Sequence, residues 1–332
     1  MLWVLAVYSI IIIRATRNAD PMEIRYPPPR IKLGTSEKYI SSNFAASSRL
    51  GNHLFELCSL LSISRKLERK PVFFIQNKYY ERMWQDSNHV IPGLMEQFLV
   101  FNGSIPKSVS KIVFHVKCCT FDDPSVLNSY DDEYIHLTGT HYQSWKYFSD
   151  KRNELIGSFK AADGIYKGLP RSDEDIFIAC VHVRRGDFLS VGFHVADENF
   201  IKNALNYIID QEEGKAREKM ATVFFGDDVP FMEHLRGAIG NSSTFVSQNS
   251  AYDDLLYAKG NCNMVLITAA HSTYGWWMGY LSKGNKVYYP DIQFTNDYIL
   301  ETGQFNPEDY YLPHWIPLRN AGLNNSTVIR SY

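Results

Sequence analysis

The sequence predicts an α/β protein whose C-terminal half is built on a mainly parallel sheet. Between residues 175 and 289, short apolar runs typical of buried strands alternate with segments of helical periodicity. The chain has 332 residues, of which 45% are hydrophobic, which is enough for one large or two ordinary domains. Charged and hydroxyl side chains stand where these strands end, and open α/β sheets bind their ligands at that edge.

The N-terminal 38 residues are predicted to form an anchor and a stem. Residues 1–13 carry no charge and are followed by Arg14 and Arg17. This run is shorter than the roughly 20 residues that a membrane span needs. We expect residues 1–17 to form a short signal anchor, with a cleaved signal or a buried strand as alternatives. Residues 18–38 are polar and proline-rich, which favours an extended stem over an arm packed on the domain.

The next segment predicts an N-terminal α/β domain over residues 39–170. Apolar residues recur at helical spacing from Leu50 to Leu67, and short strand-like runs and a further helix follow. These are strands at 71–75, 111–116 and 134–137, after which residues 139–148 lead into a helix that runs towards Phe159. The turn-rich stretch 157–175 predicts the boundary to a C-terminal domain over residues 171–332.

The alternation of apolar runs with segments of helical periodicity predicts each strand and helix of the C-terminal domain. The expected strands are 175–183, 221–225, 244–246, 264–268 and 286–289, and the expected helices are 197–211, 229–237, 251–260 and 273–282. Such alternation requires right-handed crossovers between parallel strands. Trp276 and Trp277 are expected to pack in the core rather than to bind sugar.

The segment after the strand at 175–183 predicts an anion site. It reads Val181-His182-Val183-Arg184-Arg185-Gly186-Asp187, and such charges are seldom buried without partners. In an extended segment, His182 and Arg184 project to one face while Arg185 and Asp187 project to the other. A planar guanidinium suits bidentate contact with phosphate oxygens. The alternative is a structural Arg/Asp pair at a domain interface.

Three further strand ends carry polar residues. Residues 226–228 (Gly-Asp-Asp) are predicted to cap the following helix rather than to bind metal. Asp253 and Asp254 either cap a helix or accept the donors of a guanine edge. Ser272 and Thr273 form either an ordinary helix cap or a phosphate cradle.

Overall charge and cysteine content limit the partners. Lys and Arg total 34 against 36 Asp and Glu, so that a net charge of -2 offers no general attraction to nucleic acid. The five cysteines show no zinc-type spacing, and Cys180, in an apolar run, is expected to be a buried free thiol. An oxidising compartment permits a bridge or two among the others. The expected N-glycosylation sites are Asn102, Asn241, Asn324 and Asn325.

The order of the motifs resembles the alpha-1,2-fucosyltransferase family over roughly residues 45–290. The motifs are Arg49-Leu50-Gly51-Asn52, Thr138-Gly139 with Gln143-Ser144-Trp145-Lys146-Tyr147-Phe148, His182-Val183-Arg184-Arg185-Gly186-Asp187, Phe225-Gly226-Asp227-Asp228, Asp253-Asp254, and Ser272-Thr273-Tyr274-Gly275-Trp276-Trp277. The resemblance implies a GT-B-like fold, in which two Rossmann-type halves face a cleft, and GDP-fucose as the donor substrate.

The resemblance also implies roles for individual residues. Arg184 and Arg185 would position the diphosphate as catalytic residues, His182 would contact the nucleotide, and Asp187 would brace the loop. One of Asp253 and Asp254 would bind guanine, and Ser272 and Thr273 would contact phosphate. Gly51 and Asn52 would border the cleft from the N-terminal half. No general base is evident, and the candidates are His194, Asp197, Glu198 and Asp187.

The predicted activity is the transfer of L-fucose from GDP-fucose to a galactose hydroxyl of a glycan, with inversion and without a metal ion or other cofactor. The alternatives are another linkage, protein O-fucosylation, or an inactive glycan-binding relative. The expected location is the Golgi membrane, as a single-pass type II protein with a luminal catalytic domain.

Overall fold

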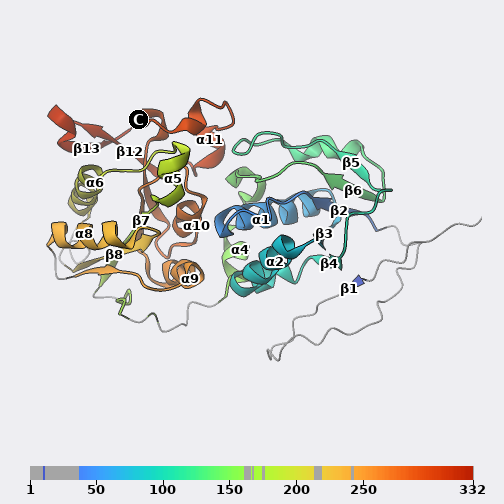
Figure 1. The fold of residues 1–332 in the computed structure, drawn as a ribbon, viewed down its shortest axis with the longest axis horizontal. Coiled ribbons are helices and arrows are strands. Elements are labelled where there is room, and N and C mark those ends of the chain that lie inside the picture. Colours follow the sequence, from blue (N-terminus) through green and yellow to red (C-terminus); the bar gives the residue numbers. More distant parts are fainter. Residues whose placement is uncertain are drawn as a thin grey trace, which may run out of the picture. The chain divides into compact units, whose positions relative to one another are not determined.

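The computed structural model describes residues 10–11, 37–160, 166, 168–173, 176–212, 219–240 and 243–331. The chain divides into two compact units, Met1–Lys160 and Ala161–Tyr332 (Figure 1). Their boundary lies inside the turn-rich stretch 157–175, ten residues before the boundary expected at 170. Each unit has its own largely parallel sheet, and the predicted α/β class is confirmed.

Unit 1 is built on a six-stranded sheet in the order β1-β4-β3-β2-β6-β5. Only β1 is antiparallel to its neighbour; the other pairs are parallel. The strands are β1 (Ile10–Ile11), β2 (Tyr39–Ser42), β3 (Lys70–Ile75), β4 (Leu99–Asn102), β5 (Ser110–Ile112) and β6 (Tyr134–Leu137). The helices are α1 (Leu50–Lys66), α2 (Lys78–Val90), α3 (Pro92–Met95), η1 (Pro124–Ser129), η2 (Trp145–Phe148) and α4 (Arg152–Ser158).

Unit 2 is built on a seven-stranded sheet in the order β13-β12-β11-β10-β7-β8-β9. Only β13 is antiparallel to its neighbour. The strands are β7 (Phe177–Val183), β8 (Met220–Gly226), β9 (Thr244–Val246), β10 (Met264–Ile267), β11 (Lys286–Pro290), β12 (Ile316–Ala321) and β13 (Thr327–Arg330). The helices are α5 (Gly186–Val191), α6 (Glu198–Gln211), α8 (Val229–Ile239), α9 (Ala251–Asn261), α10 (Thr273–Leu281), η3 (Ile292–Phe294), η4 (Tyr298–Leu300), α11 (Pro307–Tyr310) and η5 (Leu323–Asn325).

The core of unit 2 explains why its alternation could be read from the sequence. Residues of β7, β8 and β10 pack against the apolar face of α6 in one cluster, which includes Val181, Phe224, Leu266 and Ile201. Strands buried on both faces appear as continuous apolar runs, which is the pattern in the sequence. As predicted, Trp276 and Trp277 are fully buried.

One strand of unit 1 is shorter than expected. The strand expected at 111–116 ends at Ile112, and His115 has a φ of 58°, a value that no strand residue adopts. The helix expected to run towards Phe159 is α4, and the segment that leads into it forms a turn, with positive φ at His141 and Tyr142, followed by η2.

Cysteine pairing also differs from expectation. Cys180 forms a disulfide with Cys262, which links β7 to the segment before β10, so that Cys180 is not a free thiol. Cys118 and Cys119 form a second bridge, between neighbours in sequence. Cys58, in α1, is a buried free cysteine.

The predicted anchor and stem lie outside the described residues, apart from short pieces. Of residues 1–17 only Ile10 and Ile11 are described, and they pair with β4 as β1, which fits the strand alternative. Residues 37 and 38 are the described part of the stem. Among the described helices, none has both the length and the apolar character that crossing a membrane requires.

Candidate functional site

The end of β7 carries the first of the two arginines. Arg184 follows the last strand residue, and its guanidinium forms an ion pair with Asp187 in the first turn of α5. A second ion pair joins it to Asp227 at 2.6 Å, and the Arg184 side chain is 14% exposed. Two carboxylates on different segments therefore hold the guanidinium at the strand end.

Arg185 turns to different partners from those of Arg184. Its Nε donates to Asp228 at 3.2 Å, and its guanidinium lies 4.0 Å from the centroid of the Phe231 ring. Its backbone N–H donates to Asp227 at 2.9 Å. Both arginines thus form Arg/Asp pairs, which is what the alternative to an anion site predicted. These pairs join neighbouring strand ends of one unit.

The carboxylates of this network are already used by cations and backbone donors. Asp228 also caps α8, because its Oδ1 accepts the N–H of Phe231 at 3.0 Å, and capping was the predicted role of this segment. Two arginines face three carboxylates (Asp187, Asp227, Asp228), a formal sum of -1. An anion that binds here competes with carboxylates for the guanidinium donors.

Two glycines allow the strand ends to approach this closely. A Cβ on Gly186 would lie 2.6 Å from Oδ2 of Asp227, and a Cβ on Gly226 would lie 1.9 Å from the carbonyl oxygen of Val183. Real Cβ atoms do not approach other atoms so closely, so any larger residue would push Asp227 away from Arg184. The glycines are therefore part of the arginine site.

His182 lies beneath this network and is almost inaccessible. It is 1% exposed, and its Nε2 lies 3.4 Å from Oγ of Ser272. Burial lowers the pKa of the imidazole to about 3, so the ring is neutral at physiological pH. A Cβ on Gly275 would lie 2.5 Å from its Nδ1, which places the ring against the first turn of α10. In this structure His182 supports α10, and the direct nucleotide contact expected from the resemblance would require its exposure.

The two carboxylates at the start of α9 have different environments. Asp253 is partly exposed and accepts the hydroxyl of Ser250, the residue that caps α9, at 2.8 Å. Asp254 is 7% exposed and accepts the hydroxyl of Ser247 at 2.5 Å. Burial raises the pKa of the Asp254 carboxyl to about 7. A buried carboxylate beside a strand end is a stronger sign of ligand binding than a partly exposed one in a helix cap.

Ser272 and Thr273 begin α10. Ser272 is the N-cap residue, and its Oγ accepts the N–H of Gly275 at 3.2 Å. Ser272 is 2% exposed whereas Thr273 is partly exposed. Of the pair, Thr273 is the one whose side chain reaches the surface of unit 2.

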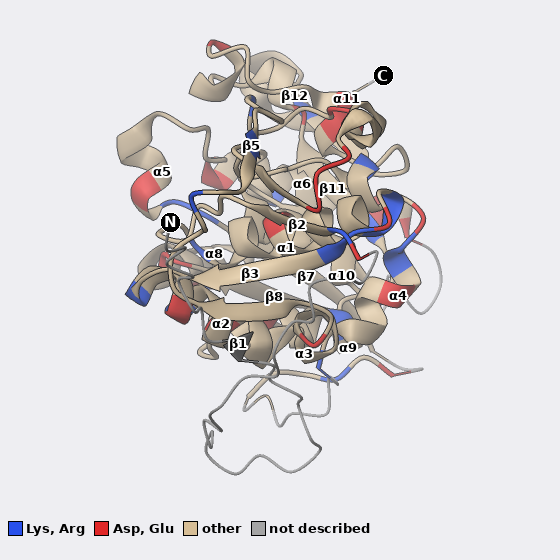
Figure 2. Cartoon of the chain, turned by 90° about the vertical axis from the view of Figure 1, so that its right-hand side faces the viewer, with Lys and Arg blue, Asp and Glu red and all other residues tan. Residues whose placement is uncertain are grey.

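Strand register places all these residues at one edge of the sheet in unit 2. His182 pairs with Phe225 of β8 on one side and with Ile267 of β10 on the other. Since β9 lies next to β8, the side chains that follow β10, β7, β8 and β9 line a single edge. This is the carboxyl edge, where parallel α/β sheets bind ligands. Figure 2 shows acidic and basic positions interspersed along the chain.

Gly51 and Asn52 lie in the first turn of α1, which follows β2 in unit 1. Gly51 is buried, Asn52 is partly exposed, and Oδ1 of Asn52 accepts the side-chain amide of Gln143 at 3.1 Å. They occupy in unit 1 the same kind of position as the arginines in unit 2, at the carboxyl edge of a parallel sheet.

Sequence reasoning missed Glu56 on the same helix. Its side chain is fully buried, and burial raises the pKa of its carboxyl to about 8. The available signal was a glutamate inside an apolar helical run, four residues after Asn52. A buried acid at that spacing shares the helix face of Asn52.

The structure gives three of the candidate general bases other partners. Asp197 caps α6 by accepting the N–H of Phe200 at 2.7 Å. Glu198 forms ion pairs with His234 and Lys202. Nδ1 of His194 lies 2.9 Å from the side-chain oxygen of Asn296.

A cavity of about 410 Å³ lies in unit 1, towards the C-terminal end of α1. Four cationic side chains line it, but Arg65 pairs with Glu154, Lys66 with Asp123 and Lys151 with Asp150. With three of these cations already ion-paired, the cavity gives weaker grounds for an anion site than the strand ends do.

Three of the predicted glycosylation positions are described. Asn102, Asn324 and Asn325 are exposed, as glycosylation requires, and Asn241 lies outside the described residues.

Comparison with known proteins identifies the family. The sequence profile of glycosyl transferase family 11 matches residues 9–319. The chain belongs to glycosyl transferase family 11. It is 44% identical over 339 residues to a Caenorhabditis elegans protein provisionally named as galactoside 2-alpha-L-fucosyltransferase svh-11, covering 100% of this chain and 93% of that protein. A C. elegans galactoside 2-alpha-L-fucosyltransferase is 33% identical over 309 residues, with 82% of this chain and 75% of that protein covered.

The family membership confirms the resemblance that the motifs indicated. Among solved structures, NodZ alpha-1,6-fucosyltransferase soaked with GDP-fucose aligns with this family 11 protein at a TM-score of 0.49 and 13% identity, over 79% of this chain and 97% of that chain. POFUT1 in complex with GDP-fucose aligns at a TM-score of 0.44 and 8% identity, over 76% and 96%.

Proposed function

We propose that this family 11 protein transfers L-fucose from GDP-fucose to a galactose hydroxyl of a glycan, forming an alpha-1,2 linkage with inversion. The observation that carries the proposal is the arginine pair after β7, held at the carboxyl edge of unit 2 by three aspartates. The names of its relatives support the linkage and the transferred sugar.

The chemistry assigns the arginines to the leaving group. When the galactose hydroxyl attacks the anomeric carbon of fucose from the face opposite GDP, the bond from that carbon to the diphosphate oxygen breaks. Negative charge then develops on the diphosphate, and Arg184 and Arg185 are the groups that stabilise it. Guanidiniums that are already fixed by Asp187, Asp227 and Asp228 need little reorganisation when this charge develops.

The proposal includes no metal ion. Fixed cations aimed at the departing diphosphate supply the charge stabilisation that a metal would otherwise supply. Two of the carboxylates beside the arginines, Asp227 and Asp228, already bind Arg184, Arg185 and a helix N-terminus, an arrangement that does not favour a metal ion.

Two assignments remain: the residue that binds the guanine base of GDP-fucose, and the location of the protein in the cell. Asp254 is the better candidate to bind guanine because it is buried beside the end of β9, whereas Asp253 belongs to the cap of α9. We assign the protein to the Golgi membrane as a single-pass type II protein anchored by residues 1–17, which the uncharged run there supports.

The test is turnover by Arg184→Ala and Arg184→Lys. Both variants should lose about 10²-fold or more in the rate of GDP release with a galactose-terminated acceptor, because lysine cannot replace a bidentate guanidinium. Arg236→Ala is the matched control, since Arg236 pairs with Glu233 at 2.7 Å on the exposed side of α8. Native turnover by both Arg184 variants would refute the assignment.

The same assay separates the alternatives. Transfer to galactose with an alpha-1,2 linkage in the product supports the proposal, whereas transfer to another hydroxyl or to a peptide supports another linkage or protein O-fucosylation. GDP-fucose or glycan binding without turnover would make the protein an inactive relative. Turnover should persist after EDTA treatment, and its loss would contradict metal independence.

A further inference from the structure

The segment that follows α5 returns to the carboxyl edge of the sheet in unit 2. The backbone N–H of Ala196 donates to the carbonyl oxygen of Thr268, the residue after β10, at 3.0 Å. The N–H of Thr268 donates in turn to the carbonyl oxygen of His182, in β7, at 3.1 Å. Residues 193–196 therefore lie at the same edge as the arginine site.

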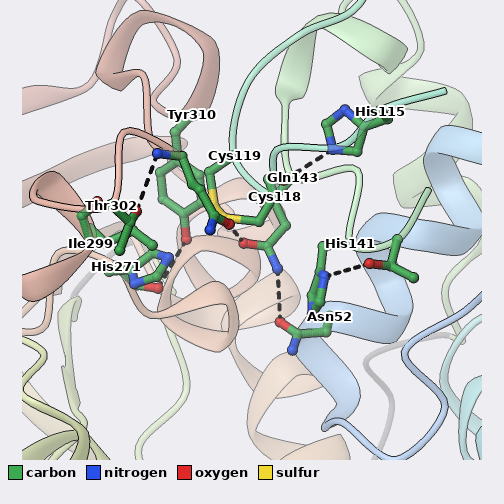
Figure 3. The surroundings of a disulfide bond; sticks show 12 residues. Asn52, His115, Cys118, Cys119, His141, Gln143, His271, Ile299, Thr302 and Tyr310 are labelled. Carbon is green, nitrogen blue, oxygen red and sulfur yellow. Dashed lines mark hydrogen bonds between the residues drawn. A yellow bond between two sulfur atoms is a disulfide. The ribbon is translucent and has the colours of Figure 1, made fainter. Parts of the chain in front are cut away.

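Phe193 connects this segment to the arginine site. The guanidinium of Arg184 lies 5.1 Å from the centroid of the Phe188 ring, which lies 5.0 Å from the centroid of the Phe193 ring. Phe193 also packs edge-on against the ring of His271, with 4.8 Å between the centroids. The carbonyl oxygen of His271 accepts the hydroxyl of Tyr310 at 3.3 Å, and Figure 3 shows this hydroxyl directed at it. Phe193 is therefore packed between the arginine site and a fixed loop.

Two consecutive residues from a distant part of the chain hold His194, the residue after Phe193. The backbone N–H of His194 donates to Oδ2 of Asp297 at 3.0 Å, and Asp297 is 2% exposed and also caps η4. Nδ1 of His194 lies 2.9 Å from Oδ1 of Asn296. An amide oxygen can only accept, so Nδ1 carries the proton and, in the neutral ring, Nε2 has the lone pair. A third group that orients the imidazole in this way is typical of a catalytic base.

The imidazole of His194 differs from the carboxylates near this edge in what a proton would cost it. Asp187 pairs with Arg184, Asp197 caps α6, and Glu198 is in ion pairs. Protonation of any of these carboxylates would weaken the ion pair or the helix cap that it forms. Protonation of Nε2 leaves the bond at Nδ1 intact. His194 is partly exposed, and its Nε2 has no hydrogen-bond partner among the described residues.

The surface around this segment suits a sugar. Tyr298 belongs to the segment that holds His194 (residues 296–298), and its backbone N–H donates to the carbonyl oxygen of Gly192, which ends α5, at 3.1 Å. The side chain of Tyr298 is 51% exposed, and Leu189 of α5 is 56% exposed. A sugar presents its C–H groups to apolar surface and its hydroxyls to polar groups, and small-molecule sites combine both kinds of surface. Exposed apolar side chains and a fixed imidazole are such a combination.

We propose that His194 is the general base of the transfer and that Asn296 is its positioning residue. Nε2 of His194 takes the proton of the galactose hydroxyl as that oxygen bonds to the anomeric carbon of fucose. The bond from this carbon to the diphosphate oxygen breaks, and its electron pair leaves with GDP, whose charge the arginines stabilise. The acceptor hydroxyl, the fucose ring and the diphosphate then lie in that order from His194 to Arg184, as attack opposite to GDP requires. The inference rests on the proposed function, which assigns no base.

The test is turnover by the full chain carrying His194→Ala or His194→Asn. The amide introduced by His194→Asn can still donate to Oδ1 of Asn296 but offers no base in place of Nε2. Both variants should lose about 10²–10⁴-fold in kcat for GDP release with a galactose-terminated acceptor, while the KM for GDP-fucose stays within about 2-fold of the native value. Added imidazole should raise the kcat of His194→Ala about 10-fold, because it supplies a base in the space that the side chain left.

The matched control is His234→Ala, because His234 is another histidine of unit 2 with one bonded ring nitrogen. Its Nε2 lies 2.8 Å from Oε2 of Glu198, and its side chain is 61% exposed. The kcat of this variant should be native and should not respond to imidazole. Native turnover by His194→Asn would mean that His194 only ties its segment to Asn296, and it would overturn the inference. A loss that imidazole does not restore in His194→Ala would count against a base in the same way.

Variants of Asn296 test the orientation of the ring. Asn296→Asp keeps an acceptor for the Nδ1 proton and should keep kcat within about 3-fold of native, whereas Asn296→Ala should lower kcat about 10-fold because the imidazole can then turn. Equal effects of the two variants would refute the positioning role. A native protein that releases no GDP would refute the proposed function and the base together, whereas native turnover that persists in His194→Asn would refute the base alone.

Discussion

Asp254 provides a prediction whose size follows from its burial. Burial raises the pKa of the carboxyl from 3.8 to about 7, so in the folded protein it resists ionisation. A folded pKa above the unfolded value means that the native state binds the proton more tightly. Its contribution to stability is complete below about pH 4 and is lost as the pH rises through 7.

The magnitude follows from the shift. Three pKa units at about 1.4 kcal/mol each give about 4 kcal/mol between pH 4 and pH 8, an order-of-magnitude value. Asp254→Asn cannot ionise but can still accept the Ser247 hydroxyl. We therefore expect the variant to exceed the native protein in free energy of unfolding by up to about 4 kcal/mol at pH 8, and to match it near pH 4.

The assay is urea unfolding of the full chain at a series of pH values, followed at the transition of unit 2. Asp253→Asn is the matched control because it removes a partly exposed carboxylate one residue away, and its effect should stay below about 1 kcal/mol. A stability difference between Asp254→Asn and native that does not vary from pH 4 to pH 8 would refute the reasoning. The same variant should bind GDP-fucose more weakly at pH 8, because an amide cannot accept both donors of the guanine edge.

Two further predictions concern unit 2. Cys180→Ala combined with Cys262→Ala should lower the free energy of unfolding by about 4.5 kcal/mol, because the bridge closes a loop with a sequence separation of 82 residues. Calorimetry measures this loss, and an unchanged melting temperature would contradict the prediction. Gly275→Ala should cost about 1–3 kcal/mol, because its Cβ would lie 2.5 Å from Nδ1 of His182; thermal unfolding measures the loss, and a stabilised variant would contradict the packing.

The sequence predicted unit 2 well because its structure is largely local in origin. Strands β7, β8 and β10 are apolar runs buried on both faces, and helices α8 and α10 begin at capping residues that the sequence shows directly, such as Asp228 and Ser272. Strands β12 and β13 are mostly exposed or partly exposed, and the sequence did not predict them. The edge where the candidate residues gather follows from the direction of parallel strands alone.

The turn after β6 could not be predicted in the same way. The sequence indicated only that this segment leads into a helix, which is α4, and gave no sign of the turn itself. The left-handed backbone at His141 and Tyr142 is instead held by α1, more than 80 residues earlier in the chain. Contacts at such separation leave no local pattern. The bridge between Cys180 and Cys262 escaped prediction for the same reason, because a sequence separation of 82 lies between the two cysteines.

Helix capping in unit 2 has a consequence for reading variant libraries of this protein. Asp228 and Ser272 start helices and also stand at the ligand-binding edge, so replacing either one lowers the amount of folded protein together with the rate. A screen that scores product alone will count both as contacts with the donor. Dividing each score by the abundance of soluble protein removes this confusion and leaves those residues whose effect on transfer exceeds their effect on folding.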